Sequence, residues 1–333
     1  MKWFKKLAID LGTANSIVWE AGEGIVLNEP TVVAVGIEDR KVLAVGNEAK
    51  SMLGKTPEYI EVIRPLEDGV IADYEVTEAM LKYFLRKVMG NNWFFGPEVM
   101  ICVPAGITQV EQRAVIDAAL SAGAKKAYLI DEPLAAAIGA KIPVSEAFGN
   151  MIVDIGGGAA EAAIIALGGV VVHQTVKVGG NKLDKAIMDY LKKKYNLVIG
   201  EQTAEVIKIK LGSAIKPKKV EELEINGRDS IYGLPKNLKI NSDEVYEALK
   251  PILEIMVTVI RDTLEITPPE LVSDIMERGI VLSGGTVKLK NFNTLVTREI
   301  GVSAHVAIES EFCVIKGTGM AIENLEVYRR AIR

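Results

Sequence analysis

The sequence predicts a mixed α/β protein built from two similar lobes that face each other across a cleft. Strand-like and helix-like segments alternate along the chain, which is typical of layered α/β domains. Asp10-Leu11-Gly12-Thr13 and Asp154-Ile155-Gly156-Gly157 each carry an apolar strand through an acidic residue into a glycine turn. They lie 144 residues apart (154 minus 10), close to half of the 333-residue chain, which indicates an internal duplication.

The first half of the chain reads as strands joined to helices. Apolar and β-branched runs predict strands at 7–9, 16–19, 31–35, 42–45, 99–103 and 127–130. Apolar residues at helical spacing, such as Met80, Phe84 and Val88, predict a helix at 77–89, and further helices are expected at 109–122 and 134–140. Pro133 suits the first turn of the last of these, where a missing N–H costs nothing.

The second half repeats this pattern. Strands are expected at 151–155, 162–167 and 170–178, and helices at 182–195, 203–212 and about 242–265. Residues 220–240 are polar and strand-like, and Asn226-Gly227 is a typical hairpin turn, so we expect the chain to reverse there. A strand at 280–282, a third glycine turn and a short C-terminal helical region complete the prediction.

Composition restricts the classes of function. The net charge of −5 argues against nucleic-acid binding, which needs a strong basic patch. Cys102 and Cys313 lie in apolar runs, and His173 and His305 stand alone, so neither a disulfide framework nor a zinc site is expected. The longest apolar run, 162–172, contains two glycines and is too short to cross a bilayer. These features favour a protein of the reducing cytoplasm.

Three glycine turns predict a phosphate-binding cleft. A glycine turn lets backbone N–H groups approach phosphate oxygens closely, because no Cβ intervenes. Asp10 and Asp154 precede two of the turns, and a carboxylate beside a phosphate requires a cation between them; we therefore expect them to hold Mg²⁺ through water. The third turn, Ser283-Gly284-Gly285-Thr286, suits close approach of a nucleoside. The chain has no Walker-type Gly-Lys-Ser or Gly-Lys-Thr motif at the required spacing.

Three further residues are candidates for the same cleft. Glu132 begins the alanine-rich helix, and a helix N-terminus favours an ionised carboxylate that could orient or deprotonate a water. Alternatively, Glu132 is an ordinary acidic residue in the first turn of a helix, without a role in a site. Lys208 could contact the nucleotide with Glu205 one turn away, and a plain surface pair at i, i+3 is the alternative.

These segments resemble the actin, sugar kinase and heat-shock chaperone ATPase superfamily, and within it the MreB family. The likeness extends over nearly the whole chain and includes 10–15, 24–30, 63–65, 68–73, 131–133, 153–158, 268–271 and 282–285. It implies an actin-like, ribonuclease H-like duplicated fold. The first lobe would comprise 1–140 with 313–333 and an inserted subdomain at about 32–65. The second would comprise 141–312 with an insertion at about 181–240.

The resemblance also implies a function. ATP or ADP with Mg²⁺ would lie between the lobes. Copies of the protein would polymerise into paired protofilaments at the inner face of the cytoplasmic membrane, and other MreB-like proteins would be further partners. These filaments would govern cell shape. The residues that would contact the nucleotide are Gly12, Thr13, Ala14, Asn15, Gly156, Gly157, Gly158, Gly180, Glu205, Lys208, Gly284 and Gly285. Glu132 would serve the hydrolytic water.

The sequence departs from the family pattern in three ways, at four positions. Ala159 and Ala160 replace two threonines, the first of which helps to place the attacking water. Losing one positioned hydrogen bond costs about 10²-fold in rate, so we expect ATP binding with weak or absent hydrolysis. Asn181 replaces a frequent aspartate near the cleft, and Lys185 replaces a frequent acidic residue on the surface.

A run of three aromatic residues, Trp93, Phe94 and Phe95, lies between a predicted helix and strand. Aromatic side chains in a surface loop are costly to expose, and tryptophan favours the membrane interface. Related proteins insert an apolar loop here into lipid, and packing of the loop onto the core is the alternative. Trp3 and Phe4 among lysines could add a second anchor.

Two other functions share this fold. A small-molecule kinase needs an acidic base for an acceptor hydroxyl, and the sequence offers no separate segment for it. A chaperone-type ATPase carries a β-rich substrate domain, whereas this sequence ends shortly after the last cleft motif.

Overall fold

Two five-stranded sheets form the framework of the protein, whose computed structural model describes residues 5–67, 69–90, 96–329 and 332. The first sheet has the order β10-β9-β1-β2-β3 and the second the order β18-β17-β11-β12-β13. The strands of the first sheet are β1 (Lys6–Leu11), β2 (Asn15–Glu20), β3 (Gly24–Pro30), β9 (Glu98–Val103) and β10 (Lys126–Asp131). Those of the second are β11 (Asn150–Ile155), β12 (Ala160–Ala166), β13 (Gly169–Val176), β17 (Ile280–Ser283) and β18 (Ala304–Val306).

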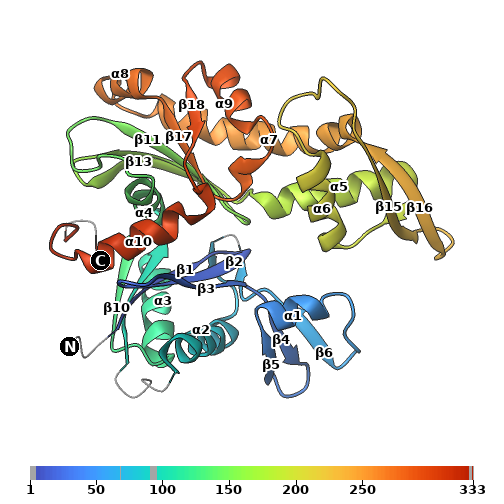
Figure 1. Ribbon diagram of the computed structural model, residues 1–333, viewed down its shortest axis with the longest axis horizontal. Helices are drawn as coiled ribbons and strands as arrows, with labels where there is room; N and C mark the ends of the chain where they lie inside the picture. Colours follow the sequence, from blue (N-terminus) through green and yellow to red (C-terminus); the bar gives the residue numbers. More distant parts are fainter. Residues whose placement is uncertain (1–4, 68, 91–95, 330–331, 333) are drawn as a thin grey trace.

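The two sheets repeat one topology. In each, an antiparallel meander (β1-β2-β3 or β11-β12-β13) is extended by two parallel strands (β9 and β10, or β17 and β18) on the other side of its first strand. The duplication predicted from the sequence is therefore present in the strand order and in the strand directions. Figure 1 shows the first lobe, in blue and cyan, below the second, in green to orange.

Helices of the first lobe cover its sheet with apolar faces. α2 (Tyr74–Met89) buries Met80, Leu81 and Phe84, and α3 (Gln109–Ser121) packs against α2. Both helices begin at a capping residue, Asp73 for α2 and Thr108 for α3, whose side chain accepts a hydrogen bond from a backbone N–H of the first turn. These caps explain why the helices start at Tyr74 and Gln109; the sequence prediction placed the first start three residues later, at 77 (77 minus 74).

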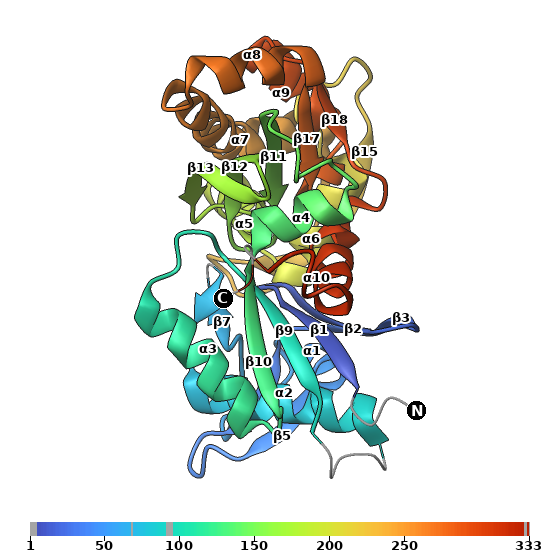
Figure 2. The same cartoon turned by 90° about the vertical axis from the view of Figure 1, so that its left-hand side faces the viewer.

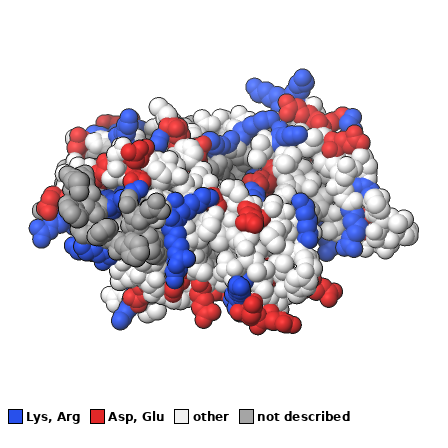
Figure 3. Space-filling model, turned by 60° about the horizontal axis from the view of Figure 1, so that its bottom comes forward, with Lys and Arg blue, Asp and Glu red and all other residues white. Residues whose placement is uncertain are grey.

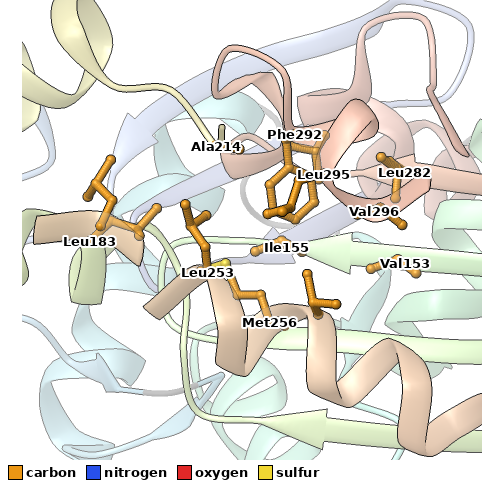
Figure 4. Packing of buried hydrophobic residues seen from close by; sticks show 14 of the residues in the cluster. Val153, Ile155, Leu183, Ala214, Leu253, Met256, Leu282, Phe292, Leu295 and Val296 are labelled. Carbon is orange, nitrogen blue, oxygen red and sulfur yellow. The ribbon is translucent and has the colours of Figure 1, made fainter. Parts of the chain in front are cut away.

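The core of the second lobe forms between its sheet and α7 (Ser242–Glu265). Figure 4 shows Val153 and Ile155 of β11 facing Leu253 and Met256 of α7, with Phe292 of α9 nearby. α9 (Phe292–Ile300) and α8 (Pro269–Arg278) flank this sheet, and neither was expected from the sequence. α7 confirms the long helix that was predicted, and it begins with a capping box between Asn241 and Glu244.

Two helices lie between the sheets and share one core with both. α4 (Glu132–Gly139) and α10 (Cys313–Glu323) pack closely on each other and bury Ala8 and Met100 of the first lobe together with Ile152 of the second. Figure 2 shows α4 and α10 between the upper and lower lobes. Their crossing lies at the base of the space between the lobes.

Each lobe also carries a smaller sheet at the right of Figure 1. In the first lobe, β4 (Val33–Gly36), β5 (Val42–Val45) and β6 (Ile60–Ile63) accompany α1 (Asn47–Met52). In the second, β14 (Leu197–Val198), β15 (Glu222–Asp229) and β16 (Pro235–Asn241) accompany α5 (Gly180–Tyr195) and α6 (Glu201–Leu211). The short elements β7 (Leu66–Glu67), β8 (Val70–Ile71), η2 (Thr286–Lys288) and η3 (Ser310–Phe312) border the cleft or its entrance.

The predicted turn at Asn226-Gly227 is wrong. Both residues lie inside β15, where Asn226 pairs with Asn237 and Gly227 with Lys236. The chain reverses instead at 230–234, because Asp229 accepts hydrogen bonds from the backbone N–H groups of Ile231 and Tyr232. Gly227 is required in the strand, since a Cβ there would lie 2.6 Å from the carbonyl oxygen of Val198.

Candidate functional site

One cleft between the lobes gathers the residues that the sequence singled out. It has a volume of about 620 Å³, within the range of small-molecule sites. All three glycine turns line it, as do Asp10, Asp154 and Glu132. The twelve residues expected to contact a nucleotide also line it: Gly12, Thr13, Ala14, Asn15, Gly156, Gly157, Gly158, Gly180, Glu205, Lys208, Gly284 and Gly285.

The first two glycine turns touch each other across the cleft. A Cβ on Gly158 would lie 2.5 Å from Oγ1 of Thr13, and a Cβ on Gly157 would lie 2.7 Å from Cβ of Ala14. Only glycine permits the backbone of the second turn to lie this close to the side chains of Thr13 and Ala14. The second turn is tethered further, because the carbonyl oxygen of Gly156 accepts hydrogen bonds from N–H of Gly180 (3.0 Å) and from Oγ1 of Thr286 (2.8 Å).

The third turn is tied to the strand before the second. Gly284 has a φ of +92°, and a Cβ there would lie 2.3 Å from the carbonyl oxygen of Ile155. Its N–H donates to the carbonyl oxygen of Ser310 at 2.9 Å, and Oγ of Ser310 donates back to the carbonyl oxygen of Gly284 at 3.0 Å. Gly285 follows with open space beside it, so the backbone is accessible from the cleft.

The side chain of Lys208 places a positive charge at the end of the cleft away from Asp10. Nζ of Lys208 lies 2.7 Å from Oδ2 of Asp184 and 3.2 Å from the carbonyl oxygen of Gly180. Glu205 instead faces Nζ of Lys50 at 3.7 Å, from the opposite lobe. The alternative of a simple Glu205–Lys208 surface pair is therefore wrong, because each side chain has a different partner.

Contacts across the mouth of the cleft connect the two lobes. Arg64 of the first lobe pairs with Glu201 of α6 at 2.9 Å, and Nε2 of Gln202 donates to the carbonyl oxygen of Lys50 at 3.3 Å. Together with the Lys50–Glu205 pair, these contacts bring α1 and α6 together over the entrance. They bridge the two lobes in this structure.

Acidic groups gather at the other end of the cleft. Burial raises the pKa of Asp10 to about 7, with a further contribution from the negative charge of Asp154. Burial likewise raises the pKa of Asp154 to about 6. Sγ of Cys102 donates to Oδ1 of Asp10 at 3.4 Å, whereas Oδ1 of Asp154 is buried without a hydrogen-bond partner. A cation would relieve both carboxylates, because each is held in a poorly hydrated position.

Mg²⁺ fits this pair better than a fully protein-ligated metal does. Among the described residues there is no group of three or more His, Cys, Asp or Glu side chains that could hold a metal ion. Mg²⁺ usually retains several waters and takes one or two carboxylates together with phosphate oxygens. Asp10 and Asp154 could hold such an ion at the phosphate end.

The pKa of Glu132 shifts against the direction expected from its place at a helix N-terminus. Burial raises the pKa of Glu132 well above its ordinary value, and the negative charges of Glu161, Asp10 and Asp154 raise it further. Desolvation and three nearby carboxylates outweigh the partial positive charge of a two-turn helix. In the absence of a cation, the pKa of Glu132 therefore shifts upward, opposite to the direction expected from a helix N-terminus.

Glu161 and Asp184 belong to the site and were missed by the sequence analysis. Both line the cleft, one beside Glu132 and the other bound to Lys208. Glu161 sits two residues beyond Ala159 on a strand that alternates toward the cleft, which was a usable signal. Asp184 lies one turn beyond Gly180, where helical spacing predicts the same face. Thr286 was quoted only as part of a turn, although it anchors Gly156.

Of the four positions that depart from the family pattern, two line the cleft and two do not. Ala159 and Asn181 line the cleft, and N–H of Asn181 donates to the carbonyl oxygen of Gly157 at 2.9 Å. Ala160 is fully buried in the core of the second lobe. Lys185 borders a second hollow on the other side of the glycine turns.

The aromatic residues of the expected membrane contacts lie outside the described residues: Trp93, Phe94 and Phe95, together with Trp3 and Phe4. Within the described part of the chain, every helix is too short or too polar to cross a bilayer.

Comparisons with known proteins match the chain from end to end. The model of the MreB/Mbl protein family matches residues 4–330. The cell shape-determining protein MreB of Escherichia coli K12 is 48% identical over 328 residues, which is 97% of this chain and 94% of the relative. The cell shape-determining protein Mbl of Bacillus subtilis 168 is 46% identical and covers 97% of each chain.

A solved structure has the same fold. The crystal structure of MreB 5 of Spiroplasma citri bound to AMPPNP has a TM-score of 0.92 at 36% identity, covering 98% of each chain. A second structure of that protein, bound to ADP, has a TM-score of 0.91. This likeness confirms the actin-like fold class that the sequence predicted.

Proposed function

The chain belongs to the MreB/Mbl family, and on this premise we propose that it is an ATP-binding protein that assembles into filaments which determine cell shape. The observation that carries the proposal is the convergence of three glycine turns, from both lobes, on one cleft. Two relatives bear the name cell shape-determining protein. The solved relative from Spiroplasma citri binds AMPPNP and ADP.

The nucleotide lies across the cleft with its triphosphate between the first two turns. Backbone N–H groups of Gly12 to Asn15 and of Gly156 to Gly158 bind the phosphates. Gly284, Gly285 and Gly180 border the nucleoside, where Lys208 supplies a cation and Glu205 closes the mouth through Lys50. Asp10 and Asp154 would hold Mg²⁺ through water, and the ion would supply the positive charge that this acidic end lacks.

Hydrolysis is slow in this protein. Glu132 lines the cleft as the candidate acceptor of a proton from water, but Ala159, which lines the same cleft, offers no hydroxyl to position that water. The loss of one positioned hydrogen bond lowers the rate of such a step by about 10²-fold. Bound ATP therefore acts chiefly as a ligand that keeps the lobes closed.

The assembled protein acts at the inner face of the cytoplasmic membrane. We place Trp93, Phe94 and Phe95 at the lipid surface. The protein assembles with further copies of itself into paired protofilaments, and it also associates with other MreB-like chains. The lobes divide as the sequence indicates, at 1–140 with 313–333 and at 141–312, with insertions at about 32–65 and about 181–240. The small sheets β4-β5-β6 and β14-β15-β16 support the two insertions.

Assembly is tested by light scattering and electron microscopy of the purified protein after ATP and Mg²⁺ are added. We expect filaments with ATP and few or none without nucleotide. A protein that binds ATP yet stays monomeric at high concentration contradicts the proposal, and substrate-stimulated ATP consumption identifies a small-molecule kinase instead.

Liposome co-sedimentation compares the protein with a variant that carries serine at positions 93, 94 and 95; equal lipid binding contradicts the membrane assignment.

A further inference from the structure

A basic surface covers the end of α6 and the loop that leads from α6 to β15. It consists of exposed lysines, none of which forms an ion pair among the described residues: Lys210, Lys216, Lys218 and Lys219. Three of these four residues lie within the segment 216–219. We call the four side chains the lysine surface. The whole chain has a net charge of −5, so this local excess of positive charge runs against its overall balance.

Hydrogen bonds fix the loop at both of its ends. N–H of Ala214 donates to the carbonyl oxygen of Lys290 at 2.8 Å. At the other end, N–H of Ser242 donates to the carbonyl oxygen of Glu221 at 2.9 Å, and N–H of Glu221 donates to Oγ of Ser242 at 3.1 Å. Pro217 restricts the backbone between these two points. A surface that is ordered before binding loses little conformational entropy when a partner docks.

Lys290 joins this loop to α6. Its Nζ donates to the carbonyl oxygen of Lys210 at 3.0 Å and pairs with Glu221 at 3.3 Å, so the end of the helix and the end of the loop lie side by side. The carboxylates that follow the loop lysines along the chain are already paired, because Glu221 binds Lys290 and Glu222 binds Lys239. The ammonium groups of the lysine surface are therefore left for a partner from outside.

Exposed apolar side chains border the lysine surface. On α6, Val206 and Ile209 expose 45% and 67% of their surface, and they share one face of the helix with Lys210 because the three residues are three and four positions apart. Val220, at the end of the loop, is half exposed. Apolar groups next to charges of one sign mark a surface for a partner that carries apolar groups and the opposite charge.

The lysine surface belongs to the lobe that does not carry the proposed lipid contact. In Figure 1, α2, which precedes the aromatic run at 93–95 in the sequence, lies in the lower lobe, whereas α6 and β15 lie in the upper lobe. Figure 3 shows that Lys and Arg occur together with Asp and Glu across the underside of the molecule. Four lysines are also far from the basic footprint that nucleic acid requires. The position and the charge thus favour a protein segment over lipid or nucleic acid.

We propose that the lysine surface binds an acidic segment of a partner protein, in which Glu or Asp residues lie next to apolar residues. The carboxylates pair with the four ammonium groups, and the apolar side chains of the segment cover Val206, Ile209 and Val220. Exposed ion pairs are individually weak, so the affinity depends on several pairs formed together with apolar burial. The inference goes beyond the proposed function and does not rest on it, because none of these residues is among those assigned to the nucleotide.

Fluorescence anisotropy of a labelled peptide tests this binding. The probe is a peptide of four Glu-Glu-Leu repeats, and we expect saturable binding that weakens as salt is added. The combined change Lys216→Gln, Lys218→Gln and Lys219→Gln should weaken binding about tenfold or more, since three of the four charges are lost. The matched control is the combined change Lys192→Gln, Lys193→Gln and Arg228→Gln, which removes the same charge from other exposed, unpaired cations of this lobe and should bind as the unmodified protein does.

Two further comparisons separate the alternatives. The double change Val206→Ser and Ile209→Ser should weaken binding of the leucine-containing peptide and leave unchanged the weaker binding of a peptide of Glu-Glu-Ser repeats. Circular dichroism verifies that each variant is folded. Absence of saturable binding, or equal weakening in the two triple variants, overturns the inference. Co-sedimentation with phosphatidylglycerol vesicles that is lost with the lysines at 216, 218 and 219 identifies a lipid surface as the partner and overturns it as well.

Discussion

Asp154 on β11 lies directly opposite Glu161 on β12, whereas its counterpart Asp10 in the first lobe lies opposite Ile17. Ile17 and Glu161 are separated by the same 144 residues as the two aspartates (161 minus 17). The duplicated lobes therefore differ at this position, with an apolar side chain in one and a carboxylate in the other. Glu161 is only 3% exposed, and its Oε2 has no hydrogen-bond partner.

Replacing Glu161 by glutamine should stabilise the nucleotide-free protein at alkaline pH. Burial raises the pKa of Glu161 from 4.5 to about 7, so the folded state binds a proton that the unfolded state has lost between those values. Stability from this group is complete below pH 4.5 and is lost as the pH rises through about 7. We expect Glu161→Gln to raise the free energy of unfolding by about 1–3 kcal/mol at pH 8 and to change it little at pH 4.5.

Urea denaturation at several pH values measures this difference. Glu29→Gln is the matched control, because Glu29 is also buried but forms an ion pair with Lys87. Loss of the Lys87–Glu29 ion pair in this variant should destabilise the protein at neutral pH. A Glu161→Gln variant that is less stable than the unmodified protein at pH 8 contradicts the prediction.

Ala159→Thr should accelerate ATP hydrolysis by about 10²-fold, because a hydroxyl at this position can hold the attacking water near Glu132. Phosphate release from the purified protein is the measurement. Ala159→Val adds the same volume without a hydroxyl and should leave the rate unchanged. Adding Glu132→Gln to Ala159→Thr should return the rate to its original level; a fast double variant shows that Glu132 is not the base.

Lys208→Ala should weaken ATP binding about 10- to 100-fold, since the removed charge leaves Asp184 unpaired at the nucleoside end of the cleft. Titration with a fluorescent ATP analogue gives the dissociation constant. Lys210, two residues further on the same helix, is exposed and lies outside the lining of the cleft. Lys210→Ala should bind as the unmodified protein does, and equal affinity of both variants rules out a role for Lys208.

Gly317→Ala should unfold or strongly destabilise the protein, by about 3 kcal/mol or more. A Cβ on Gly317 of α10 would lie 1.8 Å from the carbonyl oxygen of Ala135 on α4, and backbone cannot move aside without separating the helices. Thermal denaturation followed by circular dichroism detects the loss. Gly169→Ala, on β13 with open space around it, should be nearly neutral. A Gly317→Ala variant of ordinary stability shows that the helix crossing is not closely packed.

Much of the fold could be predicted because its signals are local. The predicted helix at 77–89 lies within α2, and the strand at 151–155 lies within β11, since apolar periodicity follows directly from which face is buried. Local signals failed at Asn226-Gly227, where a strong hairpin dipeptide lies within a strand. Pairing with β16 and the hydrogen bonds of Asp229 decided the position of the turn.

The sequence by itself determined the duplication, the three glycine turns and the acidic residues that precede two of them, because each is a pattern within a short segment repeated at a fixed separation. Only the tertiary structure decided which other side chains share the cleft. Three pairs of side chains join segments that are far apart along the chain: the neighbouring carboxyls of Glu161 and Glu132, the ion pair of Asp184 with Lys208, and the ion pair of Lys50 with Glu205. It also decided the direction in which the pKa of Glu132 shifts. Desolvation and neighbouring charge depend on what surrounds a carboxyl in space, and helix position alone predicted the opposite direction.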